Sequence, residues 1–386
     1  MGRVIILDSG LCFGLTKNLS DVLYVNMSSN AFEGYERFVG YGCDNENVKV
    51  GFVDEFDIER ADCILITDNS ISHYIEGVCG KGRNVIYPSV EAAYLEFYKS
   101  YLIENLEDFG IKVVKRKVCN NYSELVKVCE EFFKWRCVIK IDKFELKGLM
   151  DSAIILSMND FVKWSEKMSK IFGNILDRLV FAVSEYYEEG DFVEYGLDML
   201  VENGRVKKPY LVGRENGRGY LSEVTDVSLS NVVSRFEELF DVLEYNCAVS
   251  VELFVFGDGS YAVSDVNMRF GMPFSLMYPV VIENWEELLC GWNDGVKPYF
   301  RGRFVGGRIE EVDDIFEDVT DMMGMENFVP TRVMCVEGRY YSVPVFGVED
   351  YNVCGLTVGY GNTVGAVIEM VGGDDKWTKG MLKERD

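Results

Sequence analysis

Residues 251–273 read VELFVFGDGSYAVSDVNMRFGMP and place two acidic side chains on what the pattern predicts to be neighbouring strands. The Gly-Asp-Gly run at 257–259 separates two stretches of alternating apolar residues, which is a strong hairpin signal. If the turn is two residues long and ends at Gly259, Glu252 directly opposes Asp265. Negative charges in directly opposed positions repel each other, so something must compensate for them.

Two further polar residues follow on the second strand. Asn267 and Arg269 lie two and four positions beyond Asp265, which places all three on one face of an extended strand. Two carboxylates and an amide oxygen are the hard ligands that Mg²⁺ or Mn²⁺ prefers, especially when phosphates share the ion. The sequence therefore predicts that Glu252, Asp265 and Asn267 hold a divalent metal. Arg269 is then placed to bind an anionic substrate or stabilise a developing negative charge. The alternative is a solvated strand face with charges placed by chance.

Composition excludes several classes of function. The chain has 386 residues, which suggests two or three domains, and 48% of them are hydrophobic, as in a globular protein. A formal net charge of −25 repels phosphate backbones and anionic lipids, so we expect small-molecule substrates and no nucleic-acid or membrane partner. The only histidine is His73, which excludes histidine-based triads and multi-histidine metal sites.

Cysteine usage and hydropathy predict the compartment. The eleven cysteines form no CxxC pair, so free thiols in a reducing compartment are expected. No apolar run approaches the roughly 18 residues that a membrane-spanning helix needs. We therefore expect a cytoplasmic protein. As its oligomeric state we expect a monomer or a homodimer.

The apolar pattern predicts an α/β protein with α+β elements. A Rossmann-like, mostly parallel sheet is predicted from strands at residues 4–8, 21–27, 62–67 and 84–88. Further strands are predicted at residues 111–118, 137–141 and 152–157. Helices are predicted at residues 90–110, 121–135, 159–172, 231–245 and 283–292. Asn203-Gly204 predicts a hairpin turn, and glycine-rich β segments from residue 301 predict a small final domain.

The carboxylate hairpin resembles that of the ATP-grasp ligases. In that family one strand carries a carboxylate and the next carries a carboxylate–x–Asn–x–Arg run, and together they hold the metal ions of the nucleotide. Glu252, Asp265, Asn267 and Arg269 match this pattern, although the family usually has Glu where this chain has Asp265. The resemblance implies an ATP-grasp fold, ATP as a bound nucleotide and Mg²⁺ or Mn²⁺ as cofactor.

Within the ATP-grasp ligases, the chain is most similar to the phosphoribosylamine–glycine ligases (glycinamide ribonucleotide synthetases). The run SVEAAYLEFYKSYLIENLEDFGI carries Leu95, Glu96, Lys99 and Ile111 at positions that match a helix of that family, and VNMRFGMP resembles its Asn–x–Arg–Phe–Gly–Asp–Pro segment. The resemblance implies three domains: a Rossmann-like domain at 1–98, an ATP-grasp domain at 99–300 whose nucleotide lid covers 111–184, and a β-rich domain at 301–386.

The resemblance also implies which residues bind the phosphates. Lys99 and Lys140 would contact them, and Lys140 follows three apolar residues at a strand end, where a buried ammonium needs an anion. Lys147 and Gly148, in DKFELKGLM, correspond to a glycine-rich flap whose backbone amides cap the β- and γ-phosphates. The alternative for each lysine is an ordinary solvated position.

The run VSEYYEEGDF is similar to the family's adenine-binding connection. Glu185 would hold the adenine amino group, with Tyr187 beside it. Phe192 stands where the family has a ribose-binding glutamate, so Asp191 or Glu194 would have to replace that acceptor. The alternative is a plain acidic strand face.

The substrate half of the resemblance is weaker than the nucleotide half. DSGLCFGL replaces the family's amino-terminal glycine-rich loop, TDNSIS replaces its Gly–Pro–Glu, and Met272 replaces an acid. Arg214, Arg218 and Arg269 are the candidate substrate-binding residues, because guanidinium groups suit carboxylate and phosphate. Arg269 and Lys147 are the candidate catalytic residues.

The implied function is ATP-dependent ligation of a carboxylate to an amine through an acyl phosphate. Glycine and 5-phosphoribosylamine are the leading substrate pair, which would place the reaction in purine biosynthesis. Three alternatives stay open: a ligase for another amino acid and amine, a non-catalytic nucleotide-binding protein on a decayed ligase scaffold, and a purely structural protein.

Overall fold

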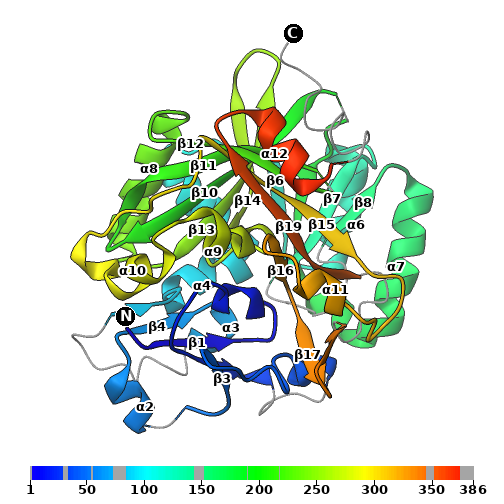
Figure 1. Ribbon diagram of the computed structural model, residues 1–386. Coiled ribbons are helices and arrows are strands. Elements are labelled where there is room, and N and C mark those ends of the chain that lie inside the picture. The colour runs from blue at the N-terminus through cyan, green and yellow to red at the C-terminus, as the bar shows by residue number, and fades with distance from the viewer. Residues whose placement is uncertain are drawn as a thin grey trace. The chain divides into compact units, whose positions relative to one another are not determined.

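The structure is a computed structural model that describes residues 2–28, 34–53, 55–72, 84–142, 152–188, 190–216, 218–344 and 352–373 (Figure 1). The chain divides into two compact units. Unit 1 comprises Met1–Ala93, Glu194–Val251 and Asn267–Asp386, and unit 2 comprises Tyr94–Val193 and Glu252–Val266. The predicted boundaries of three domains stay a prediction.

Unit 1 begins with a five-stranded parallel sheet in the order β3-β2-β1-β4-β5. Its strands are β1 (Val4–Asp8), β2 (Val22–Asn26), β3 (Val48–Val50), β4 (Cys63–Ile66) and β5 (Val85–Ile86). β1, β2, β4 and β5 consist almost entirely of buried apolar residues, as expected for parallel strands covered on both faces. These four predicted strands are confirmed. The sequence did not predict β3, because its three residues, Val48–Val50, are too few for their alternation to indicate a strand.

A larger sheet has the strand order β14-β13-β10-β11-β12-β15-β19-β16 (Figure 1). Its strands are β10 (Phe192–Glu202), β11 (Arg205–Asn216), β12 (Gly219–Thr225), β13 (Ala248–Phe256), β14 (Tyr261–Asn267), β15 (Phe304–Glu311), β16 (Phe328–Pro330) and β19 (Val353–Gly361). The predicted turn at Asn203-Gly204 is confirmed, since both residues have positive φ and Glu202 pairs with Arg205. The segment after residue 301 adds β15, β16 and β19 to this sheet, and β17 (Val333–Val336) and β18 (Arg339–Ser342) form a separate hairpin.

The helices of unit 1 are mostly short. They are α2 (Glu55–Arg60), α3 (Asn69–Ser72), α8 (Ser230–Val242), α9 (Tyr278–Val281), α10 (Trp285–Cys290), α11 (Thr320–Met323) and α12 (Val364–Val371). α8 packs on β11, and α12 packs on β15 and β19 through a small core that includes Val367 and Val371. No helix in the described ranges is long and apolar enough to span a membrane.

Unit 2 contains a four-stranded antiparallel sheet in the order β6-β9-β7-β8. Its strands are β6 (Arg116–Cys119), β7 (Cys137–Asp142), β8 (Ser152–Ile155) and β9 (Val180–Glu185). One face packs on α6 (Tyr122–Lys127) and α7 (Met158–Phe172) through a core that includes Cys119, Ile139 and Phe181. Residues alternate between the faces of a strand, so Lys140 and Ala182 belong to the face opposite this core.

Two predicted helices differ from the structure. The single helix predicted at 90–110 is divided into α4 (Val90–Phe97) and α5 (Lys99–Asp108), because Tyr98 has the non-helical dihedral angles φ −106° and ψ 84°. The helix predicted at 121–135 continues beyond α6 only as a π-helical stretch, Val128–Phe132. The strand predicted at 111–118 is shorter at its start, since β6 begins at Arg116.

Candidate functional site

The turn between β13 and β14 is one residue longer than predicted. Gly259 N–H donates to the Phe256 carbonyl at 2.9 Å, and Phe256 N–H donates to the Ser260 carbonyl at 2.9 Å. Gly259 has φ +80°, as expected for the last residue of a three-residue hairpin loop. The predicted two-residue turn is therefore wrong. Counting from this turn, Glu252 lies opposite Ser264, whose hydroxyl donates to the Glu252 carbonyl at 3.1 Å.

The cation that lies beside Asp265 is Lys140, which the sequence analysis assigned to the nucleotide phosphates. Its Nζ lies 2.6 Å from Oδ2 of Asp265 within unit 2, and the exposed fractions of the two side chains are 23% and 10%. Burial lowers the pKa of Lys140, but the charges of Asp265 and Glu252 outweigh this effect, and the pKa is raised overall. Lys140 is therefore charged, and both carboxylates act on it although they are not directly opposed.

A second cation, which the sequence did not predict, belongs to the same group of charges. Arg116, the first residue of β6, is buried enough to lower its pKa, and the charges of Asp265 and Glu252 oppose that shift. Two acids thus share two bases within unit 2. The sequence did not distinguish Arg116 from its neighbours, because Lys115 and Lys117 flank it and the three residues form one basic run.

These charged groups match part of the divalent metal site that the resemblance to the ATP-grasp ligases implies. Among the described residues no cluster of three or more His, Cys, Asp or Glu side chains could enclose an ion. Glu252 and Asp265 nevertheless provide two hard carboxylate groups that act on the same two cations. Such an incomplete oxygen set fits Mg²⁺, which keeps waters and is usually held by one or two carboxylates together with substrate phosphates.

An aromatic cluster in unit 2 surrounds the predicted adenine-binding residues. The Phe192 and Phe254 rings lie 4.0 Å apart between centroids, and Tyr187 contacts both of them and Phe256 at 5.3–6.2 Å. The Tyr187 hydroxyl donates to Glu185 Oε2 at 3.3 Å. The sequence analysis missed Phe254 and Phe256, although Glu252, Phe254 and Phe256 alternate along β13 and thus share one face.

The other predicted nucleotide-binding residues have different local roles. Asp191 is exposed, and its Oδ2 accepts from Glu188 N–H at 3.2 Å, so it stabilises the turn before β10. Lys99 is the first residue of α5. The predicted flap residues Lys147 and Gly148 lie outside the described residues.

The predicted substrate-binding residues belong to unit 1. Arg214 on β11 pairs in register with Tyr195, and its Nε donates to the Tyr195 hydroxyl at 3.3 Å. Arg218 is exposed in the turn between β11 and β12. Asn267 ends β14, and Arg269 Nη1 donates to the Phe270 carbonyl at 3.2 Å. The role of these arginines in substrate binding, and that of Asn267 in metal binding, therefore stay predictions.

The first strand end of unit 1 is organised by a buried carboxylate. Asp8 Oδ2 accepts from Gly10 N–H at 3.1 Å, from Cys12 N–H at 2.8 Å and from the Tyr24 hydroxyl at 2.6 Å. Its Oδ1 accepts from the Thr67 hydroxyl at 2.6 Å. The segment DSGLCFGL, which replaces the family's glycine-rich loop, is thus fixed by internal hydrogen bonds at Asp8.

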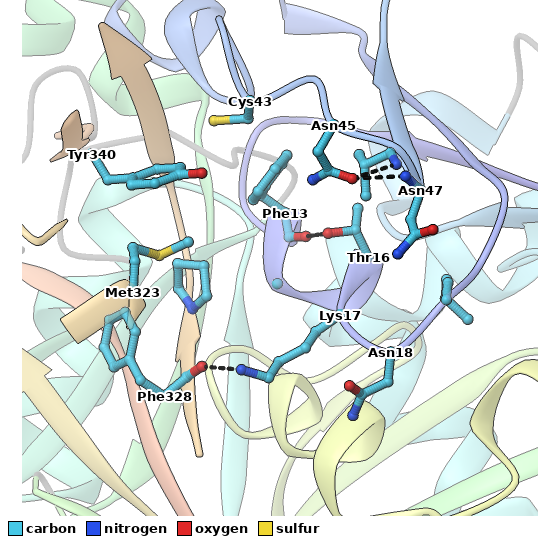
Figure 2. Close-up of a pocket in the computed structure, with 14 residues that line it drawn as sticks. Phe13, Thr16, Lys17, Asn18, Cys43, Asn45, Asn47, Met323, Phe328 and Tyr340 are labelled. Atoms are coloured by element: carbon cyan, nitrogen blue, oxygen red, sulfur yellow. Dashed lines mark hydrogen bonds between the residues drawn. The ribbon is translucent and has the colours of Figure 1, made fainter. Parts of the chain in front are cut away.

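A pocket of about 210 Å³ lies elsewhere in unit 1, and Figure 2 shows the residues that line it. Lys17 Nζ donates to the Phe328 carbonyl at 2.8 Å at one side, and Asn45 and Asn47 lie at another. Phe13 and Gly14 of the DSGLCFGL segment line this pocket, together with Asn47 and Val48 at the start of β3. None of the predicted site residues that the structure describes lines this pocket.

The fold defined by these elements is that of the ATP-grasp enzymes. The chain is similar to the phosphoribosylamine–glycine ligase of Thermotoga maritima, with a TM-score of 0.67 and 16% identity over 98% of this chain and 96% of that one. It is also similar to the N5-carboxyaminoimidazole synthetase of Staphylococcus aureus complexed with ADP, with a TM-score of 0.63 and 12% identity over 98% and 97% of the two chains.

A third similar structure is the L-amino acid ligase of Bacillus licheniformis, with a TM-score of 0.58 and 13% identity over 93% of each chain. Neither a protein-family model nor a curated protein sequence matches the chain. The expected α/β ATP-grasp fold is therefore confirmed by structure alone, at identities where sequence comparison finds no relative.

Proposed function

We propose that the protein is an ATP-dependent ligase that joins a carboxylic acid to an amine through an acyl phosphate. The observation that carries this proposal is a cluster of charged side chains on the face of the unit 2 sheet opposite its helix-packed core. There Lys140 contacts Asp265 and also interacts with Glu252. A lysine next to two carboxylates suits the binding of a polyphosphate together with a metal ion. The similar structures of this fold are named as ligases or synthetases.

The nucleotide would bind mainly through unit 2. Lys140 and Lys99 neutralise its phosphates, while Glu185 and the aromatic cluster of Tyr187, Phe192, Phe254 and Phe256 receive the base. Glu252 and Asp265, with the amide of Asn267, would hold Mg²⁺ or Mn²⁺. When bound, that ion would neutralise part of the charge of the phosphates.

The reaction needs no nucleophile from the protein. A substrate carboxylate attacks the γ-phosphorus, the bond to ADP breaks, and the resulting acyl phosphate loses phosphate to an attacking amine. Arg269 would stabilise the negative charge of the acyl phosphate, and Lys147 would act from the flap. Catalysis therefore rests on positioning and electrostatics, which suits a chain with a single histidine.

The finer substrate assignment is glycine with 5-phosphoribosylamine, giving glycinamide ribonucleotide, ADP and phosphate. The similarity to a phosphoribosylamine–glycine ligase over 98% of the chain supports it. Arg214, Arg218 and Arg269 would bind the carboxylate and the phosphate of these substrates. The Asp8 loop weighs against this pair, because its polar groups are engaged with each other and the family's basic loop is replaced.

Release of ADP and phosphate in the presence of ATP and Mg²⁺ tests the proposal. We expect turnover only when an acid and an amine are both present. Hydroxylamine, added in place of the amine, should trap the acyl phosphate. Turnover with glycine and phosphoribosylamine would support the finer assignment, and turnover with another pair from a panel of amino acids and amines would replace it. Binding of ATP without turnover on any pair would favour a non-catalytic nucleotide-binding protein.

A further inference from the structure

Arg116 and Lys140 occupy the same face of the unit 2 sheet. Arg116 on β6 pairs with Ser184 on β9, and Lys140 on β7 pairs with Ala182 on the same strand. Ser184 and Ala182 are two residues apart, so they and their partners point to one side of the sheet. The other side packs on α6 and α7 through the core that contains Cys119, Phe181 and Val183, so Arg116 and Lys140 lie on the face turned away from these helices.

The contacts of Arg116 do not use the whole guanidinium group. Its Nε is buried and has no hydrogen-bond partner among the residues that the structure describes. A buried donor without a partner costs about 1–3 kcal/mol, so a structural ion pair alone is a poor explanation for this side chain. A guanidinium group presents parallel N–H donors that match two oxygens of one phosphate, which is the geometry that would satisfy Nε.

We propose that Arg116 is a second phosphate-binding residue of the nucleotide site, beside Lys140. In the free protein its positive charge compensates Asp265 and Glu252. With nucleotide bound, and with a metal ion held by the two acids, Arg116 would donate to the polyphosphate. This inference rests on the proposed nucleotide binding of unit 2. The ligand class is a nucleoside polyphosphate, and Arg116 is a residue that the sequence pattern did not single out for binding it.

Calorimetric titration with ATP and Mg²⁺ and, separately, with adenosine tests this role. We expect Arg116→Gln to weaken ATP binding by about tenfold to a hundredfold, the range for one charge-assisted hydrogen bond, and to leave adenosine binding within about twofold. Lys117→Gln is the matched control, because it removes one positive charge from the neighbouring position on the opposite face, where Lys117 Nζ lies 4.7 Å from the Phe132 ring centroid. We expect it to change neither affinity.

The outcomes separate this inference from the proposed function. If the wild-type protein binds no ATP, the proposed nucleotide site and the role of Arg116 both fail. If the wild-type protein binds ATP and Lys140→Gln weakens it, but Arg116→Gln does not, the inference alone is overturned. An equal loss of ATP and adenosine binding in Arg116→Gln would show a structural role and would also overturn it.

A second pair of variants guards against a folding defect in Arg116→Gln, which leaves two acids facing one cation. Glu252→Gln and the double variant Glu252→Gln/Arg116→Gln differ only at Arg116, and the double variant keeps one acid with one base. We expect the ratio of ATP to adenosine affinity, measured without metal, to be about tenfold lower in the double variant. Equal ratios would overturn the proposal.

Discussion

Lys140 Nζ and Asp265 Oδ2 lie 2.6 Å apart and are both largely withdrawn from solvent. This ion pair joins β7 to the strand that carries one of the two predicted metal-binding acids. Asp265 is also held locally, since its Oδ1 accepts from Val266 N–H at 2.9 Å. The acid is therefore fixed in place before any ligand arrives.

Removal of either partner of this pair is expected to destabilise the protein. We expect Lys140→Gln and Asp265→Asn each to lower the free energy of unfolding by about 1–3 kcal/mol, because each leaves a partly buried charge without its partner. The double variant should recover part of that loss, with a coupling energy of about 1 kcal/mol or more. Urea-induced unfolding of the four proteins measures it, and strictly additive losses would contradict a direct interaction.

The aromatic cluster predicts that the hydroxyl groups of the ribose contribute little to nucleotide affinity. The Phe192 and Phe254 rings lie 4.0 Å apart between centroids, and in the proposed nucleotide site Phe192 would lie near the ribose, where an apolar ring offers no acceptor. We expect 2′-deoxy-ATP and 3′-deoxy-ATP to bind within about threefold of ATP, since loss of a hydroxyl that has no protein acceptor costs little.

Competition titrations of the three nucleotides against one another check this expectation. Phe254→Ala serves as the paired variant, because it removes the stacked ring and should weaken all three nucleotides alike, by about tenfold. A preference for ATP of more than about tenfold would mean that another residue accepts the ribose hydroxyls.

Asp8 is expected to be needed for folding rather than for chemistry. Four donors, two from the backbone and two from the Tyr24 and Thr67 side chains, converge on its buried carboxylate. We expect Asp8→Ala to lower the free energy of unfolding by about 3–5 kcal/mol, because the buried donors lose a charged acceptor together. Asp21→Asn, at an exposed position before β2, should change it by less than about 0.5 kcal/mol. Equal effects of the two substitutions in thermal unfolding would refute this role.

Much of the fold could be predicted from local pattern. The strands that became β1, β2, β4 and β7 are apolar runs bounded by polar residues, and the hairpin was found from the Gly-Asp-Gly run at 257–259. The error of one residue in its turn arose because a glycine with φ +80° is equally compatible with a loop of two or three residues.

The site was predictable only where residue types were unusual for their surroundings. Glu252 and Asp265 are charged residues on otherwise apolar strands, and Lys140 follows three apolar residues. Arg116, in contrast, lies between two lysines, so its charge is not unusual for its position. Which of these three basic residues points toward the acids depends on the phase of a four-residue strand, and the sequence predicted the start of that strand five residues too early. Tertiary pairing with β9 settles the phase.

Asp198 is expected to make stability depend on pH. It lies on β10, is 7% exposed, and approaches Gly271, the glycine of the NMRFGMP segment. Burial raises the pKa of its carboxyl group, although hydrogen bonds from Tyr220 and Ser250 oppose the shift. A raised pKa in the folded state means that the folded protein binds the proton more tightly than the unfolded chain. The contribution of Asp198 to stability is therefore full at acidic pH and is lost as the pH rises through its folded-state pKa.

Asp198→Asn removes this titration while keeping a similar shape. We expect the free energy of unfolding of Asp198→Asn, relative to the wild-type protein, to increase as the pH rises from the ordinary aspartate pKa through the raised folded-state pKa, because the wild-type carboxyl loses its proton at a cost. Urea-induced unfolding at several pH values measures the difference, in which the titrations shared by both proteins cancel. Asp177→Asn, at an exposed position of unit 2, is the control for loss of a carboxylate. A difference that is constant with pH, or that favours the wild-type protein as the pH rises, would show that the Asp198 carboxylate is stabilised by its hydrogen bonds more than it is penalised by burial.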